Sequence, residues 1–342
     1  MNLIQKKYFN YEMWDVLEEY TDSEHPLTIR ELYNIVKIRG IYDVDYATVK
    51  RTLQELSSYF DEVNLTDMER RRPSGKKTIK HGYYIDHRFE PVELRTMIDA
   101  LILNKNASGS ILDSIIAKIE ALSSKYFRTN ISHIKRTDVK ARSCNNLFYA
   151  LEILNEAIAQ NKKVSFYYYE YHTDKKMYPR RRSSGEPRLY KINPYCIAPA
   201  TQRYYLICNF DGYEGYSYYR VDRIADIKIL DEPVRPVNEI KRLENGLNLP
   251  AHLAEHIYMF TGESRLVEMK VNRKILNDLF DWFEDFTITE LDDTYIIIKV
   301  KLNVNAVKLW AMQYGAYVEI LSPDFIRNDI KKLLEEMTER YS

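Results

Sequence analysis

Cysteine and glycine are both scarce in this chain. The 342 residues include three cysteines and ten glycines. Cys144, Cys196 and Cys208 lie far apart, with no CxxC spacing and no histidine pair nearby, which argues against a zinc site and against a disulfide framework. We therefore expect reduced, packed thiols, no bound metal and no cofactor.

The motifs of the common catalytic sites are also absent. The sequence contains no Gly-rich phosphate loop, no GxSxG, no HExxH and no spaced acidic cluster of the nuclease type. Acid–base catalysis without a metal would need a positioned histidine or a carboxylate pair. His172 alone gives little support for a catalytic site. We expect a protein that is not an enzyme, with a nucleic-acid-processing enzyme as the alternative.

Long apolar runs are missing as well. No stretch approaches the roughly 20 apolar residues that a membrane helix needs. Residues 2–20 are charged and amphipathic, which is unlike a secretory signal peptide. These features predict a cytoplasmic location and no membrane partner.

Charge is balanced over the whole chain but unevenly placed. Fifty Lys and Arg match fifty Asp and Glu, so the chain is not a general polyanion binder. Residues 70–80 carry six basic and no acidic side chains, and residues 161–191 carry nine basic against three acidic. From residue 231 onward acids outnumber bases by 20 to 14. Two local basic patches predict two places that meet phosphate.

Residues 1–88 predict three helices followed by a hairpin. Apolar residues recur at helical spacing over residues 3–17. Thr28, with Glu31 three residues later, has the capping-box spacing that begins a second helix. Asp45 has the character of an N-cap for a third helix.

This layout predicts a DNA-binding domain. Two helices joined by a short turn form a helix-turn-helix, and the start of the second helix meets base edges in the major groove. A basic hairpin after three helices is a wing whose arginines contact phosphate or the minor groove. We expect double-stranded operator DNA as a partner. The alternative is that the basic side chains of this segment only face solvent. The candidate DNA-binding residues are Tyr46, Thr48, Lys50, Arg51, Arg70, Arg71, Arg72, Lys76 and Lys77.

Two strongly apolar helices are predicted in residues 89–145, near residues 94–102 and 111–122. A hydrophobic helix pair between a DNA reader and a sensor most simply serves as a dimer interface or an interdomain joint. We therefore predict a homodimer, and packing within one protomer is the alternative.

An amphipathic helix and several short strands are predicted in residues 146–235. The tripeptide Tyr204-Tyr205-Leu206 lies one short loop before a second strand, residues 219–224, that carries two arginines. As a hairpin, these strands gather tyrosine rings and guanidinium groups on one small surface. Rings stack on bases and arginine forks match phosphate oxygens, which favours a nucleotide or single-stranded nucleic acid as effector.

The same residues, with Ile192-Asn193-Pro194-Tyr195 before them, resemble the WYL domain of bacterial transcriptional regulators. Tyr204 stands at the first position of the family's Trp-Tyr-Leu signature. The resemblance implies an Sm-like five-stranded barrel that senses nucleic-acid-like effectors, for some members single-stranded DNA. It extends to a winged helix-turn-helix before the barrel and to a C-terminal extension after it.

The family pattern matches three candidate effector-binding positions, Tyr205, Arg220 and Arg223. Arg220 is favoured because its neighbours in the strand would point to the opposite sheet face. The alternative to effector binding by Arg223 is an ion pair with Asp222 that only stabilises a turn. The full set of candidate effector-binding residues is Tyr168, His172, Arg188, Tyr190, Tyr205, Arg220 and Arg223.

A hinge is predicted at residues 231–236 from their proline content. Residues 236–342 then predict strands and helices in β-α-β-α-β-α order, and Trp310, Gly315 and the segment 318–323 are similar to the extension that follows WYL domains.

The whole chain therefore predicts an α+β protein with four regions: winged helix-turn-helix, helical linker, small barrel and α+β extension. We expect a homodimeric transcriptional regulator, with repression as the default mode, although no residue separates repression from activation. A barrel that serves as a protein–protein contact surface is a further alternative.

Overall fold

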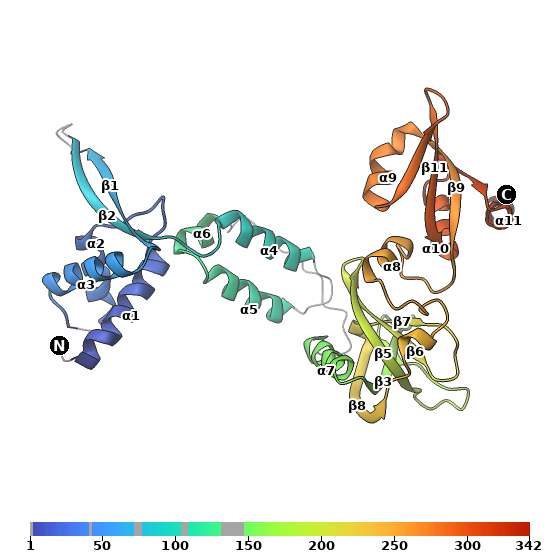
Figure 1. Ribbon diagram of the computed structural model, residues 1–342, viewed down its shortest axis with the longest axis horizontal. Helices are drawn as coiled ribbons and strands as arrows, with labels where there is room; N and C mark the ends of the chain where they lie inside the picture. Colours follow the sequence, from blue (N-terminus) through green and yellow to red (C-terminus); the bar gives the residue numbers. More distant parts are fainter. Residues whose placement is uncertain (1–2, 41–42, 72–76, 104–108, 131–146) are drawn as a thin grey trace. The chain divides into compact units, whose positions relative to one another are not determined.

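The chain is an α+β protein, as predicted, with helices and one hairpin in its N-terminal part and the larger sheets later in the sequence (Figure 1). It divides into two compact units, Met1–Ala141 and Arg142–Ser342. The computed structural model describes residues 3–40, 43–71, 77–103, 109–130 and 147–342. Within these ranges, none of the helices has both the length and the apolar character needed to cross a membrane.

Three helices and a hairpin open the first unit, as the sequence predicts. The helices are α1 (Leu3–Tyr20), α2 (Ile29–Arg39) and α3 (Tyr46–Tyr59). The strands β1 (Val63–Arg71) and β2 (Lys77–Ile85) pair antiparallel along their whole length. Leu27, just before α2, forms an isolated β-bridge with Tyr83 of β2, which ties the start of α2 to the hairpin.

The predicted helix caps are both present. The Thr28 hydroxyl accepts the N–H of Glu31 while the Glu31 carboxylate accepts the N–H of Thr28, at 3.4 and 2.9 Å. Gly40 ends α2 in the left-handed conformation, with φ of 65°, which glycine adopts at low cost. The Asp45 carboxylate accepts the N–H of Thr48 at 2.7 Å and so begins α3.

One core holds these elements together. Fully buried side chains from α1 and α2 meet the inward face of α3 and the base of the hairpin. Its largest members include Phe9, Met13, Leu17, Leu32 and Leu53. Arg39, at the end of α2, reaches back to the carboxylates of Glu12 and Glu19 on α1.

The helical linker contains one helix more than predicted. The two predicted apolar helices are α4 (Pro91–Leu103) and α5 (Gly109–Glu120), and the additional one is the short α6 (Lys125–Asn130). Six residues are too few to show a helical period in the sequence. Phe127 of α6 joins Leu94 and Ile98 of α4 in a small core, so part of this apolar surface is covered within the protomer.

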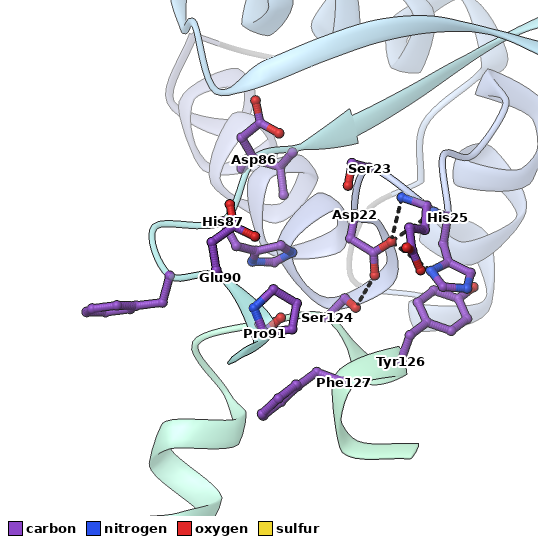
Figure 2. A pocket seen from close by; sticks show the side chains of 14 residues that line it. Asp22, Ser23, His25, Asp86, His87, Glu90, Pro91, Ser124, Tyr126 and Phe127 are labelled. Carbon is purple, nitrogen blue, oxygen red and sulfur yellow. Dashed lines mark hydrogen bonds and ion pairs between the residues drawn. The ribbon is translucent and has the colours of Figure 1, made fainter. Parts of the chain in front are cut away.

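A polar cavity of about 400 Å³ lies where α6 meets the loop before α2 (Figure 2). The Asp22 carboxylate accepts a hydrogen bond from Ser124 Oγ at 2.6 Å and from the N–H of His25 at 2.8 Å. Burial opposes ionisation here, but the bonds from Ser124 and His25 outweigh it and lower the pKa of Asp22. The His25 ring also stacks on Tyr126 at 3.7 Å, so α6 is fastened to the three-helix part.

A six-stranded antiparallel sheet begins the second unit, preceded by α7 (Leu147–Ala159). The strands β3, β5, β6 and β7 are neighbours in that order, and both β4 and β8 pair with β3. The 3-10 helix Val221–Arg223 separates β7 from β8, and no closed barrel is found among these described strands. The sequence did not predict β4. The strands are β3 (Lys162–Tyr171), β4 (Met177–Pro179), β5 (Leu189–Ala200), β6 (Arg203–Phe210), β7 (Ser217–Arg220) and β8 (Ile224–Pro233).

The two faces of this sheet are covered by different elements. On one face α7 packs over a core that includes Phe166, Ile192 and Leu206. On the other face Ile207 and Ala198 contact Met259 and the short helix α8 (Leu249–Glu255). The sheet is therefore buried on both sides over much of its area.

The predicted hinge at residues 231–236 is not a free joint. β8 extends through Pro233, and the N–H of Arg235 donates to Asn193 Oδ1 of β5 at 2.9 Å. Tyr195 Oη donates to the carbonyl of Arg235 at 3.0 Å. These bonds tie the proline-rich segment to the sheet, which composition alone could not show.

A four-stranded antiparallel sheet in the order β10-β11-β9-β12 forms the last part of the chain. Its core centres on Trp310, Phe283 and alternate strand residues. The sequence missed β10, which pairs with β11 in a hairpin whose turn is capped by Asp292. The elements are β9 (Ser264–Asn272), α9 (Leu276–Trp282), β10 (Phe286–Glu290), β11 (Tyr295–Asn303), α10 (Val304–Gln313), β12 (Val318–Ser322) and α11 (Asp324–Tyr341).

A cluster of histidines and tyrosines joins α8 to the six-stranded sheet. Tyr218 Oη lies 2.6 Å from His252 Nε2, and Tyr216 Oη lies 3.1 Å from His256 Nε2. The two imidazoles stack with centroids 4.4 Å apart. Burial, followed by the neighbouring His256, lowers the pKa of His252 to about 4, and burial also lowers the pKa of His256.

This cluster predicts a loss of stability in acid. An unfolded histidine titrates near its usual value of about 6.5, so between that pH and about 4 the unfolded state binds a proton that folded His252 does not. The full pKa difference corresponds to about 3–4 kcal/mol, and because His252 is only partly buried we expect the free energy of unfolding to fall by on the order of 2–3 kcal/mol across this window. Above the window this stability is fully present. Urea unfolding at a series of pH values measures it.

His252→Gln is the matched control, because glutamine keeps a hydrogen-bond acceptor for Tyr218 and cannot titrate. The variant should show a flatter dependence on pH between 6.5 and 4. An equally steep dependence in both proteins would mean that His252 does not cause the loss.

Candidate functional sites

The outward face of α3 is the first candidate site. Its exposed residues recur at the spacing of one helical face, opposite the buried Val49, Leu53 and Leu56. These exposed residues are Ala47, Lys50, Arg51, Gln54 and Ser58. A face with two cations and an amide can contact phosphate oxygens and base edges.

The predicted α3 residues are not all equivalent. Lys50 and Arg51 lie together on the exposed face, and Arg51 Nε is 4.0 Å from Glu55. Tyr46 is exposed with its ring edge against Tyr33. Thr48 is half-buried in the first turn of the helix, and its N–H donates to the Asp45 cap. The prediction missed Gln54, although its position one turn after Lys50 was a usable signal.

The basic hairpin is described in part. Arg72 and Lys76 lie outside the described residues. Arg71 and Lys77 are paired at the ends of β1 and β2, and Arg70 precedes them on β1. The contribution of these residues to DNA binding stays a prediction.

The second candidate site is a cluster of three arginines, Arg203, Arg220 and Arg223, of which the first two contact one buried carboxylate. Asp222 is 2% exposed and lies in the 3-10 helix after β7. Arg220 donates to it through Nε at 3.0 Å and Nη2 at 2.6 Å, and Arg203 Nη1 lies 3.3 Å from the same carboxylate. A two-pronged pair of this kind fixes the plane of the Arg220 guanidinium.

Asp222 compensates these arginines unequally. Burial disfavours the charged form of Arg220, but the bonds to Asp222 outweigh burial and raise its pKa. Burial lowers the pKa of Arg203, and the charge of nearby Arg220 lowers it further. The Asp222 carboxylate therefore faces two guanidinium groups, and this local excess of cationic side chains suits an anion.

Two tyrosine rings border this charge. Tyr205 on β6 is the register partner of Arg220 on β7, which confirms that the two predicted strands pair. The second strand ends at Arg220, however, so Arg223 lies in the 3-10 helix and not on the predicted strand of residues 219–224. Its hydroxyl lies 3.3 Å from Thr201 Oγ1. The Arg223 guanidinium lies over the ring of Tyr171 at 5.6 Å, and its buried Nε has no hydrogen-bond partner among the described residues.

Tyr168 and Tyr190 lie beneath this surface. Both are buried in the aromatic core with Phe166 and Tyr219. Tyr168 Oη accepts the backbone N–H of Arg220 at 3.2 Å, and burial raises the pKa of Tyr168. Their burial makes them supports for the arginines rather than rings that a base could reach.

Arg188 and His172 lie on other parts of the sheet. Arg188 covers the ring of Tyr190 at 4.7 Å, and Arg180 covers the ring of Tyr168 at 5.1 Å. His172 is exposed, with its ring edge against Tyr178 in the β3–β4 hairpin. No contact between His172 and the three arginines is seen in the described part of the chain.

The sequence prediction missed Arg203 and Arg180. Arg203 was detectable, because it precedes Tyr205 by two residues and so shares its sheet face. Arg180 lies in the basic stretch that the charge count found, but its contact with Tyr168 depends on the unpredicted strand β4.

Comparison with known proteins identifies the domain that holds the arginine cluster. The family model for the WYL domain matches residues 149–229, which include β3 to β7 and the three arginines. Residues 149–229 form a WYL domain. No curated protein is significantly similar to the chain.

Two solved structures are similar to the chain at low identity. One is proteasome accessory factor B/C (PafBC) of Arthrobacter aurescens, with 13% identity and a TM-score of 0.29 over 97% of this chain and 48% of that one. The chain thus spans about half the length of that structure. The other is a CRISPR Cas-related protein, with 15% identity and a TM-score of 0.35 over 89% of this chain and 76% of that one. Neither likeness is close enough to assign a function.

The buried position of Asp222 predicts a large effect of its neutralisation. Asp222→Asn removes the charge that Arg203 and Arg220 share, and breaking a buried ion pair costs about 3–5 kcal/mol. Since both arginines are partly exposed, we expect a value near the lower limit, about 3 kcal/mol, from chemical unfolding. Glu214→Gln, which breaks the exposed pair with Lys241, is the control and should change stability by less than about 1 kcal/mol. Equal effects of the two substitutions would contradict the role of Asp222.

Proposed function

We propose that this protein is a DNA-binding transcriptional regulator whose WYL domain senses a nucleic-acid-like or nucleotide effector, with repression as its default mode. The observation that carries the proposal is the exposed face of α3, which bears Lys50 and Arg51 in the first half of a well-capped helix and Gln54 one turn after Lys50. No catalytic step is part of the proposal.

The order of elements in residues 3–85 supports a winged helix-turn-helix. α2 and α3 follow one another through a short connection, and β1 and β2 form the hairpin that would be the wing. Such a domain places its second helix in the major groove and its hairpin against the backbone or the minor groove. The basic hairpin residues would then contribute affinity, and α3 would contribute sequence preference.

The arginine cluster supports the effector half of the proposal. Arg203, Arg220 and Arg223 offer guanidinium groups for phosphate, and Tyr205 offers a half-buried ring beside them. Stacking and charge together are the means by which proteins hold single-stranded nucleic acid. The alternative, a protein contact surface, would use the same cluster for acidic side chains.

A homodimer is part of the proposal. Several apolar side chains of the helical linker are exposed in the single chain, among them Val92, Met97, Leu103 and Leu122. A two-fold dimer would present two copies of α3 to an inverted repeat with half-sites about one helical turn or a small multiple apart. An effector would act only by binding two dimer states with different affinity.

The α3 face can be tested by charge removal. Lys50→Ala with Arg51→Ala should abolish protection of an operator in a footprint over the protein's own upstream region, since each base contact contributes about 1–3 kcal/mol of discrimination. Lys118→Ala with Arg128→Ala removes the same charge from α5 and α6 and should keep the footprint. A wild-type footprint from the α3 variant would show that this helix does not read DNA.

The arginine cluster can be tested separately. Arg203→Gln leaves the Arg220–Asp222 pair in place, so the fold should persist while affinity for a short single-stranded oligonucleotide falls. The slope of log affinity against log salt should flatten by about 0.7 for each phosphate that the variant no longer neutralises. Operator protection should remain but no longer respond to the oligonucleotide.

Lys241→Ala is the matched control, because it removes an exposed cation from the same unit. It should leave both affinity and slope unchanged. If the wild-type chain binds no oligonucleotide or nucleotide at all, the cluster is better explained as a protein contact surface.

A further inference from the structure

The C-terminal helix α11 is covered by its own domain over its first half only. Ile326 is fully buried in the core of the four-stranded sheet, and Ile330 packs against the same core. From Lys331 to Ser342 every residue is exposed, although the helix continues to Tyr341. An isolated helix of about three turns is marginal in water, so we expect another surface to cover this second half.

The first half of α11 is firmly attached to its domain. Lys308 of α10 donates to the Asp329 carboxylate at 3.1 Å, and Arg327 donates to Glu319 of β12 at 2.7 Å. Arg327 also donates to the carbonyl of Ile320 at 2.9 Å. These contacts fix the direction of α11, so its second half is presented to a partner in a defined orientation.

The buried face of α11 continues as an uncovered apolar stripe. Apolar residues follow Ile330 at intervals of three and four, which places them on the same side of the helix as the residues that enter the core. They are Leu333, Leu334, Met337 and Tyr341, and all four are exposed. A stripe of this width and length suits the matching face of another helix.

The charges beside the stripe reverse along the helix. Residues 327–332 carry three basic side chains and one acidic, whereas residues 335–340 carry three acidic and one basic. Within one helix, a lysine four residues before a glutamate is the less stabilising order. Two antiparallel copies would instead place the basic half of each helix beside the acidic half of the other, and a parallel pair would oppose like charges.

We propose that α11 pairs in antiparallel orientation with α11 of a second copy of this chain, centred near Leu333. Lys331 and Glu335 lie one turn apart on the same flank of the stripe, and equal flanks meet in an antiparallel pair, so Lys331 of one copy meets Glu335 of the other. This contact gives the homodimer of the proposed function a surface apart from the helical linker, and so rests on the chain being a homodimer.

Charge reversal on the full chain tests the pairing. Lys331→Glu with Lys332→Glu leaves Arg340 as the one basic residue of the uncovered half, and Glu335→Lys with Glu336→Lys leaves Glu339 as its one acid. All four changed side chains are exposed, so both variants should fold, as circular dichroism can verify. Each variant alone should dimerise about tenfold more weakly than the wild-type chain, because attraction across the pair becomes repulsion. Sedimentation over roughly 1–100 μM measures the association.

A mixture of the two variants separates contact between chains from effects within one helix. Repulsion between residues four apart in one helix persists in the mixture, whereas the acidic helix of one chain attracts the basic helix of the other. The mixture should therefore recover most of the wild-type association. Lys241→Glu with Lys274→Glu is the matched control, because it reverses two exposed cations elsewhere in the same unit and should leave association unchanged.

Three results would overturn the proposal, and they differ in what they imply for the homodimer. If both variants associate as tightly as the wild-type chain, the homodimer depends on another surface, such as the helical linker. Weakening of each variant without recovery in the mixture would place the effect within one helix. A folded wild-type monomer throughout the concentration range would also remove the homodimer of the proposed function.

Discussion

The arginine cluster of the WYL domain depends on the buried carboxylate of Asp222. The carboxylate fixes Arg220 through two hydrogen bonds and also contacts Arg203. Tyr168 Oη, in the aromatic core, accepts a hydrogen bond from the backbone N–H of Arg220. The core therefore helps to position the arginine. A buried ion pair adds little to net stability, but removing its acid would leave arginines uncompensated. The arrangement is therefore better understood as a device that orients positive charge than as a source of stability.

Two separate basic surfaces follow from this organisation. The face of α3 belongs to the first unit and carries its cations on one side of a helix whose other side is core. The arginine cluster belongs to the second unit and is embedded in a sheet that is covered on both faces. A helix face can enter a groove of duplex DNA, whereas a small sheet surface with arginines and a ring suits a single strand or a nucleotide. This difference is the reason for assigning operator binding to α3 and effector binding to the arginine cluster in the proposed regulator.

Local signals predicted local structure well. Thr28 and Asp45 were recognisable as caps because capping depends on residues within one turn. The burial of Tyr168 and Tyr190 was not recognisable, since it depends on which sheet face α7 covers. The position of Arg203 on the face of Tyr205 could be read from the sequence, but its contact with Asp222, nineteen residues away, could not. Contacts of this kind depend on strand register, which short apolar and polar patterns specify only weakly.

The most direct test of the account is the occupancy of the operator, measured with the full chain as a short single-stranded oligonucleotide is added. We expect specific protection of an inverted repeat that changes cooperatively with oligonucleotide concentration, because the effector and the operator would bind different surfaces of one molecule. An oligonucleotide that competes with the operator for one surface would give simple displacement, with each ligand excluding the other completely. Simple displacement would contradict the proposal that the WYL domain senses an effector while a separate domain binds DNA. Oligonucleotide binding that leaves operator occupancy unchanged would contradict it as well.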